Sequence, residues 1–211
     1  MKTLSLTRII VALLVTAAVF VLARCGSDAK KAEVAVTSAE GNKMMSETKS
    51  SVSEVERGHY IVTTALCNDC HSPKIMTREG PVADSSRLLS GHPADSKIPA
   101  MKNIGPQGWI SCSPDLTAWL GPWGLSFTAN LTPDSTTGLG AWNTEMFMKA
   151  MRTGKHMGVE TGRTIVPPMP WNYIGQMTDE DLRAVFVYLL SLKPIVNKVP
   201  ANLSPPEMAK M

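Results

Sequence analysis

The pattern of apolar positions predicts its clearest helix near the C-terminal end of the chain. Apolar residues recur there at the spacing i, i+3, i+4, i+7 and i+8, which places them on the face of a helix that packs against a core. These residues are Leu182, Val185, Phe186, Leu189 and Leu190. Thr178 is the expected N-cap, acidic residues occupy the first turn, and Pro194 is expected to end the helix.

Two further helices are predicted from their capping signals. Residues 53–56 match the capping box S-x-x-E and begin a helix that is expected to run from about Glu54 to Leu66. Gly58 lies inside it, where glycine is less favourable than alanine by about 1 kcal/mol, so we expect another helix to approach closely there. Asn143 is the expected N-cap of a helix over residues 144–153 that ends at Gly154.

The long interval from residue 72 to residue 141 is rich in glycine and proline turn signals. We expect loops, at most a short hairpin, and few long elements. Trp109, Trp119 and Trp123 fall in this interval and are interpreted as aromatic filling of a loop-rich core, with a cofactor-covering or partner-facing loop as the alternative. Residues 196–211 contain three prolines and are expected to form a loosely packed tail.

The N-terminus predicts export from the cytoplasm. Lys2 and Arg8 precede the apolar stretch Ile9–Leu22, which is too short to span a bilayer comfortably but suits a secretory signal. Residues 22–26 resemble a bacterial lipoprotein box in which Cys25 would be lipidated, although Arg24 stands where a small residue is usual. An uncleaved anchor and a plain secretory signal remain alternatives. We expect a protein on the periplasmic or cell-envelope side, held at a membrane by a lipid anchor.

Composition then defines the boundaries of the predicted regions. Residues 27–51 are rich in Ala, Lys, Glu, Ser and Thr and show no apolar period, as is typical of a flexible tether. We therefore divide the chain into a lipoprotein-like signal peptide (1–24), a tether (25–52), a folded domain (53–195) and a tail (196–211). Without the three basic residues of the signal, 18 basic and 18 acidic side chains remain, so nothing predicts a nucleic-acid partner.

The candidate chemistry centres on residues 67–71, which read C-x-x-C-H, the attachment signature of c-type haem. Cys67 and Cys70 would each form a thioether with one porphyrin, and His71 would bind the iron. Three alternatives compete, and one of them is a chance match of five residues. A thioredoxin-like pair needs a βαβ context, and a structural zinc site needs four ligands, whereas the remaining cysteines, Cys25 and Cys112, are isolated. Cys112 has no evident partner and is expected to be buried and inert.

A second ligand to the iron is predicted in residues 167–171, which read PPMPW. Three prolines stiffen this loop, and a stiff loop suits a thioether ligand such as Met169. His156 and His92 remain alternatives that would give bis-histidine ligation. Residues near position 156 form a basic cluster that we interpret as a solvated helix end, with an acidic partner or a haem propionate as alternatives; they are Arg152, Lys155, His156 and Arg163.

The order of these motifs resembles class I-like bacterial cytochrome c domains over residues 53–194. A helix leads into CNDCH, a long loop region and PPMPW follow, and the last helix ends DLRAVFVYLLSLKP. Residues 130–142 are similar to the haem domains of dehydrogenase-associated cytochrome c subunits. The resemblance implies a mainly α cytochrome c fold, in which the N- and C-terminal helices cross near Gly58 and Tyr188, with a long Gly/Pro-rich loop region and one covalent haem.

The same resemblance implies the roles of the site residues. Cys67 and Cys70 would hold the haem, His71 would be the proximal ligand and Met169 the distal one. The implied function is one-electron transfer in the bacterial cell envelope, without catalytic residues and with a dehydrogenase or a terminal oxidase among the redox partners. A haem-based sensor with an open distal site is the alternative. Dehydrogenase subunits often carry several haems, whereas this chain has one C-x-x-C-H.

Overall fold

The computed structural model describes residues 53–98 and 109–210. The predicted signal peptide, the lipidation candidate Cys25 and the tether lie outside the described residues. Within the described residues, no helix combines the length and the apolar character needed to cross a membrane.

The first predicted helix forms at its capping box. α3 (Glu54–Thr64) begins after Ser53, whose hydroxyl accepts a hydrogen bond from the Glu56 amide (3.2 Å). The Glu56 carboxylate accepts one in return from the Ser53 amide (2.9 Å). The helix ends two residues earlier than predicted, and Leu66 then adopts a left-handed conformation with φ 58°. This turn separates α3 from a second short helix, α4 (Cys67–His71).

The other two predicted helices also form. α5 (Thr144–Thr153) has the predicted bounds, with the Asn143 side chain accepting from the Met146 amide (2.9 Å) and Gly154 in the left-handed conformation after its last turn. α7 (Asp179–Ser191) begins after Thr178, whose hydroxyl accepts from the Asp181 amide (3.1 Å). Shorter helical segments complete the described set: η1 (His156–Gly158), α6 (Trp171–Ile174) and α8 (Pro205–Met208).

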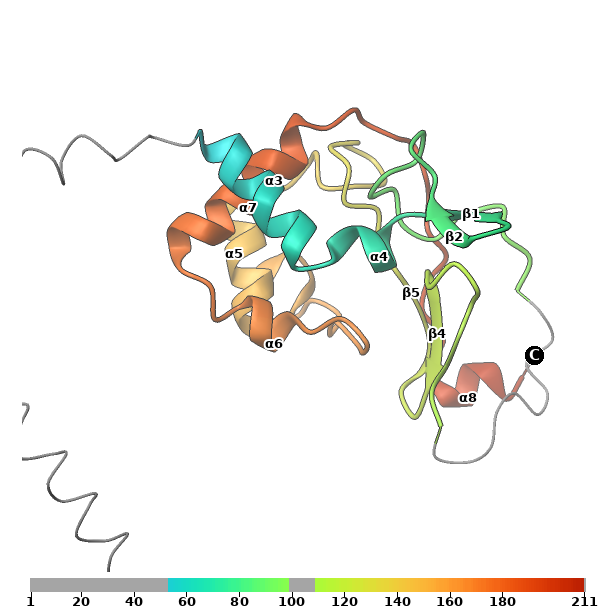
Figure 1. Cartoon of the computed structure of the whole chain (residues 1–211). Helices are drawn as coiled ribbons and strands as arrows, with labels where there is room; N and C mark the ends of the chain where they lie inside the picture. The colour runs from blue at the N-terminus through green and yellow to red at the C-terminus, as the bar shows by residue number, and fades with distance from the viewer. Residues whose placement is uncertain (1–52, 99–108, 211) are drawn as a thin grey trace, which may run out of the picture. The chain divides into compact units, whose positions relative to one another are not determined.

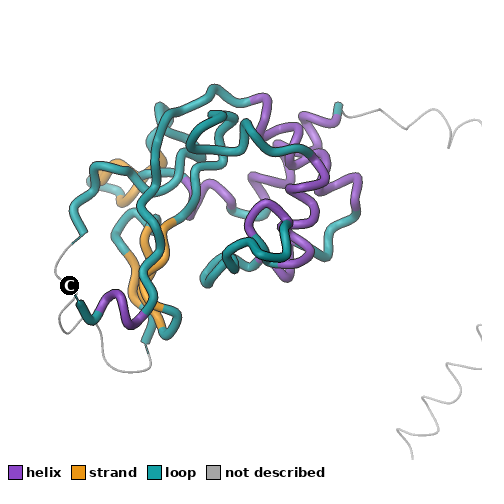
Figure 2. Tube along the Cα trace, turned by 180° about the vertical axis from the view of Figure 1, so that it is seen from behind, coloured by secondary structure: helices purple, strands orange, loops and turns teal. Residues whose placement is uncertain are grey.

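Residues 72–141 contain more regular structure than predicted. β1 (Lys74–Thr77) and β2 (Gly80–Ala83) form an antiparallel hairpin. β3 (Ser111–Cys112), β4 (Ala118–Gly121) and β5 (Gly124–Phe127) form a second antiparallel sheet in that order. The mainly helical prediction is therefore only partly correct. The sequence did not reveal these strands because each is too short to show a periodic pattern. Figures 1 and 2 show α3, α5 and α7 together on one side of α4 and the strands on the other.

Two apolar clusters fill these two regions. The larger one joins α3, α5 and α7 and includes Val62, Phe147, Leu182, Phe186 and Leu189; Phe147 and Phe186 stack at 5.2 Å. The smaller one lies against the three-stranded sheet and consists of Ala118, Leu125 and Phe127 with partly buried neighbours. Trp119 and Trp123 are half-buried in this sheet region, whereas Trp109 is 73% exposed. The exposure of Trp109 contradicts its interpretation as core filling, and Trp119 and Trp123 are only partly enclosed and belong to neither apolar cluster.

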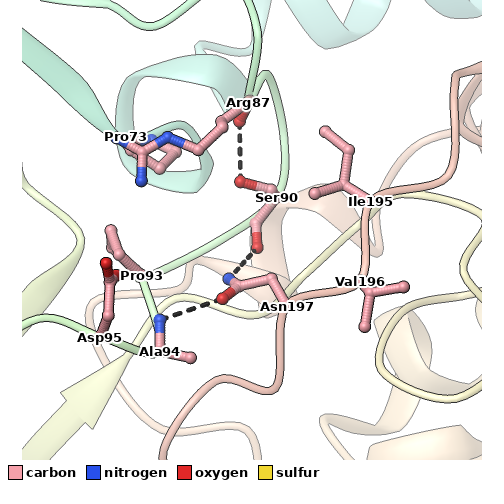
Figure 3. Close-up of a pocket in the computed structure, with 9 residues that line it drawn as sticks. All are labelled: Pro73, Arg87, Ser90, Pro93, Ala94, Asp95, Ile195, Val196 and Asn197. Carbon is pink, nitrogen blue, oxygen red and sulfur yellow. Dashed lines mark hydrogen bonds between the residues drawn. The ribbon is translucent and has the colours of Figure 1, made fainter.

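The C-terminal tail is not loosely packed, contrary to the prediction. Leu203 and Leu125 exchange two backbone hydrogen bonds of 2.8 Å, which extend the sheet beyond β5. The Asn197 amide donates to the carbonyls of Ser90 (2.7 Å) and His92 (2.9 Å), and its oxygen accepts from the Ala94 amide (3.0 Å), as Figure 3 shows in part. The prolines of the tail do not prevent these hydrogen bonds, because the donors and acceptors belong to Asn197 and Leu203.

The two terminal helices of the helical region meet at Gly58, as the sequence predicted. A Cβ atom at Gly58 would lie 2.0 Å from the Ala184 carbonyl oxygen and 2.7 Å from the Tyr188 Cβ. Ion pairs flank this contact: the Arg57 guanidinium lies 2.8 Å from the Asp181 carboxylate, and Arg183 lies 2.8 Å from Glu54. These exposed pairs contribute little stability, so the glycine contact and the apolar cluster hold the helices together.

We expect Gly58→Ala to destabilise the domain, although helix propensity alone predicts a gain of about 1 kcal/mol. The added methyl group cannot fit against the backbone of Ala184, and overpacking of this kind costs about 3 kcal/mol. Guanidinium unfolding followed by circular dichroism measures the difference. Thr63→Ala on the exposed face of the same helix is the control. Equal stability of the two variants would contradict the close packing.

Candidate cofactor site

The short helix α4 brings the three residues of the predicted haem motif together. Cys67 and Cys70 are separated by three positions and His71 follows Cys67 by four, so all three lie near one face of the helix. Both cysteines are half-buried and neither forms a disulfide. The left-handed Leu66 lets the chain turn between α3 and α4. The motif is therefore displayed as two free thiols beside one imidazole.

Burial keeps the two thiols protonated. It raises the pKa of Cys67 to about 11. It also raises the pKa of Cys70, with a smaller contribution from the nearby Asp69 carboxylate. The attacking thiol of a thioredoxin-like pair needs a lowered pKa, so this alternative does not fit. Zinc does not fit either, because no group of three or more His, Cys, Asp or Glu side chains in the described residues could hold a metal ion.

The surroundings of His71 leave a lone pair on Nε2 of its imidazole. It is buried, and its Nδ1 lies 2.8 Å from the Ala129 carbonyl oxygen. Because a carbonyl can only accept, Nδ1 carries the proton and Nε2 keeps its lone pair. Nε2 has no hydrogen-bond partner among the described residues. Burial lowers the pKa of His71, which favours the neutral ring that a metal requires. The donor set therefore fits a haem iron approached by Nε2.

The carbonyl that orients His71 is itself firmly held. Next to it, the Asn130 side chain accepts from the Thr132 amide (3.0 Å) and hydroxyl (2.7 Å) and donates to the Ile195 carbonyl (2.8 Å). The Leu131 amide donates to the Leu89 carbonyl (2.8 Å). Sequence reasoning marked residues 130–142 only as a resemblance and missed Ala129, because a backbone acceptor leaves no side-chain signal.

The predicted distal ligand lies in a loop that is fixed at one side. Met169 is partly buried and packs against the same helical cluster as Cys67. Two residues earlier, the Pro167 carbonyl accepts a hydrogen bond of 2.8 Å from the Ser126 hydroxyl in β5. Cys67 and Met169, about a hundred residues apart in sequence, thus both pack against the same apolar cluster.

The two alternative histidines have different surroundings. The ring of His92 is enclosed, with Nδ1 2.8 Å from the Thr117 hydroxyl and the ring 4.7 Å from that of Phe127. His156 is half-buried with its ring edge against Trp142 at 5.1 Å. Burial lowers the pKa of His156, and the neighbouring positive Arg163 lowers it further.

The rest of the basic cluster is largely engaged by local partners. Arg152 pairs with the Asp179 carboxylate (2.6 Å) and donates to the Gly175 carbonyl. The Lys155 ammonium donates to the Thr164 hydroxyl (3.1 Å). Local pairing of this kind agrees with the interpretation of the cluster as a helix end.

The expectation that Cys112 is buried was wrong. It lies exposed on β3, the outer strand of the three-stranded sheet, opposite Trp119. The sequence offered no partner for this cysteine, and the structure pairs it with none among the described residues.

A buried lysine clamps α4 to this sheet. The Lys74 ammonium, with a side chain only 5% exposed, donates to the carbonyl oxygens of Asp69 and Asp115, the latter at 2.7 Å. Asp69 belongs to α4, and Asp115 lies between β3 and β4. The clamp therefore fixes the helix that carries the thiols and the imidazole, and sequence reasoning did not identify it.

Comparison with known proteins agrees with the geometry. No protein-family model matches the chain. The fructose dehydrogenase cytochrome subunit of Gluconobacter japonicus is 26% identical over 67% of the chain and 22% of its own length. The gluconate 2-dehydrogenase cytochrome c subunit of Pantoea cypripedii is 27% identical over 64% of the chain and 22% of its own length.

A third relative gives a shorter match. The cytochrome c subunit of the quinone alcohol dehydrogenase of Gluconobacter oxydans is 34% identical over 37% of the chain and 16% of its own length. The chain thus spans less than a quarter of each of these relatives. All three are cytochrome subunits of dehydrogenases, which confirms the resemblance predicted from the sequence.

Replacing Lys74 with methionine should loosen the attachment of α4. The variant keeps the buried stem but loses two hydrogen bonds from a charged donor, and we expect a loss of about 2–3 kcal/mol in unfolding free energy. Guanidinium unfolding checks this value. Lys149→Met, at an exposed position of α5, is the control and should change stability by less than about 0.5 kcal/mol. A similarly small change in Lys74→Met would contradict the clamp.

Proposed function

We propose that the chain is a one-electron carrier of the bacterial cell envelope that holds a single covalent haem c. One observation carries the proposal: α4 presents two unpaired thiols beside a buried imidazole whose Nε2 is free. This donor set matches the needs of haem c and does not suit the thioredoxin or zinc alternatives. The dehydrogenase cytochrome subunits that resemble the chain support the same reading.

The residues of α4 take two roles in this proposal. Cys67 and Cys70 supply the two thioether sulfurs that fix the cofactor to the helix. His71 supplies the proximal nitrogen, and the Ala129 carbonyl fixes its tautomer and makes the ring a better donor. These residues would hold one haem, whose iron would supply the one-electron redox chemistry.

Met169 is the proposed distal ligand. The prolines around Met169 and the hydrogen bond from Ser126 to Pro167 restrict the loop. A restricted loop suits a thioether, because a thioether binds iron weakly and must be held in place. His92 is less suited because its ring is enclosed and already bonded to Thr117. If His71 and Met169 both bound the iron, no iron position would be left for a substrate, and for this reason the proposed role is electron transfer without catalysis.

The proposed location rests on the predicted export signal, and the proposed partners rest on the named relatives. The predicted export signal and the lipidation candidate Cys25 would hold the domain (53–195) at a membrane through the tether (25–52). The named relatives favour a dehydrogenase as the electron donor. A terminal oxidase is a further proposed redox partner. Encounters between such redox partners use small, weak interfaces.

Covalent attachment can be tested through the thiols. We expect the mature protein to carry the mass of one haem, Cys67→Ala and Cys70→Ala each to keep one link, and the double variant to lose covalent haem. Haem staining on a denaturing gel and mass spectrometry measure these outcomes. Cys112→Ser is the matched control and should keep the cofactor. A double variant that still carries covalent haem would refute the assignment.

The distal ligand can be tested by absorption spectroscopy. The oxidised protein should show the charge-transfer band between sulfur and iron, and Met169→Ala should abolish it because no thioether remains. The reduced variant should then bind carbon monoxide. Met76→Ala, on the exposed face of the β1–β2 hairpin, is the control and should keep the band. Ready binding of carbon monoxide by the unaltered protein would instead favour the sensor alternative.

A further inference from the structure

Two buried polar atoms in the segments that bond to His71 have no hydrogen-bond partners. They are Nε2 of His92 and Oγ1 of Thr128, and they are the fully enclosed unpartnered side-chain atoms found in the described residues. His92 is 3% exposed, and its backbone amide donates to the Thr128 carbonyl (3.0 Å). Native proteins rarely leave such atoms unpaired, so an unpartnered buried imidazole calls for an explanation.

The surroundings of His92 fix the position of its proton. The Thr117 hydroxyl donates its single hydrogen to the Asp115 carboxylate (2.8 Å), which can only accept. Thr117 Oγ1 must therefore accept from His92 Nδ1 (2.8 Å), and the lone pair of the ring lies on Nε2. Asp115 is held in turn by Ser113 and by the Lys74 clamp on its carbonyl.

The stability of the fold does not account for a histidine at this position. One neutral hydrogen bond gains no more than the penalty for burying an unpaired nitrogen. A phenylalanine would fill a similar volume, keep the ring contact with Phe127 and carry no such penalty. What histidine adds is a rigid link from residue 92 to Thr117 and Asp115.

That link acts on the segments that hold His71. Gly91, next to His92, donates its amide to the His71 carbonyl (2.8 Å). Ala129, next to Thr128, accepts from His71 Nδ1 (2.8 Å). Gly91 also packs on the same backbone, since a Cβ there would lie 2.5 Å from the Thr128 oxygen and 2.7 Å from the Ala129 oxygen. Both hydrogen bonds to His71 thus depend on how residues 91–92 lie against residues 128–129.

We propose that His92 is a positioning residue for the proximal ligand, which it orients through Gly91 and Ala129. The inference rests on the proposed function, because it assigns the role of His92 relative to His71 as an iron ligand. In this assignment His92 is not an iron ligand, and its own contacts are to Thr117 and Phe127. Its ring, anchored by Thr117 and Asp115, keeps the two segments around His71 in register.

The test uses the full haem-bearing protein with three variants. His92→Phe removes the anchor and keeps the ring, and Thr117→Val removes its hydroxyl partner. His92→Asn keeps an amide donor in the position of Nδ1 and is the rescue variant. His59→Phe is the matched control, since His59 is an exposed histidine whose ring packs on Tyr188 at 5.1 Å.

Two measurements are made on each protein. Amide hydrogen exchange of Gly91 should rise by at least about tenfold in His92→Phe and Thr117→Val, while exchange at Leu189 in α7 stays unchanged. The nuclear magnetic resonance shifts of the haem methyl groups in the oxidised state report the orientation of the axial imidazole. They should move in the same direction in both variants and stay near the wild-type values in His92→Asn and His59→Phe.

The outcomes separate the possibilities. Unchanged Gly91 exchange in His92→Phe overturns the inference. Faster exchange with unmoved methyl shifts also overturns it, because His92 would then be structural only. A wild-type protein without covalent haem overturns the proposed function, and with it the positioning role, whatever the Gly91 exchange shows.

Discussion

The hydrogen bond from His71 Nδ1 to the Ala129 carbonyl is the contact on which the site depends. It joins residues that are 58 positions apart and decides which ring nitrogen carries the proton. Without it the imidazole could turn, and the lone pair would no longer be fixed on Nε2. Asn130, Gly91 and the Lys74 clamp all serve to hold the two ends of this bond in place.

Two regions hold α4 in place, one through apolar packing and one through hydrogen bonds. On one side, α3 leads directly into it, and α3 is fixed by the contact of Gly58 with α7 and by the helical cluster. On the other side, Lys74 links α4 to the turn between β3 and β4, and the Gly91 amide donates to the His71 carbonyl. The tail in turn holds the segment around Gly91 through the bonds from Asn197 to the carbonyls of Ser90 and His92. The thiols and the imidazole therefore lie between a packed apolar unit and a hydrogen-bonded one.

Local signals in the sequence were sufficient for the helices but not for the contacts between distant segments. Ser53, Asn143 and Thr178 act on residues within one turn, so the helices begin where these caps predict. The pairing of Leu125 with Leu203 and the acceptor role of Ala129 arise between backbone groups and leave no pattern in side chains. Motif chemistry predicted His71 and Met169 as ligands and these roles remain proposals, whereas the surroundings of His92 and the exposure of Cys112 required coordinates.

The long sequence separations in the site have a consequence for the order of assembly. If the chain is exported N-terminus first, as proposed, residues 67–71 reach the envelope before Ala129, and Asn197, which bonds to the His92 carbonyl, arrives last of the three. During that interval the thiols are not yet enclosed, and the burial that raises the pKa of Cys67 is absent. Under the proposed export and haem attachment, the reactive groups of the motif would thus be most accessible before the fold closes around them.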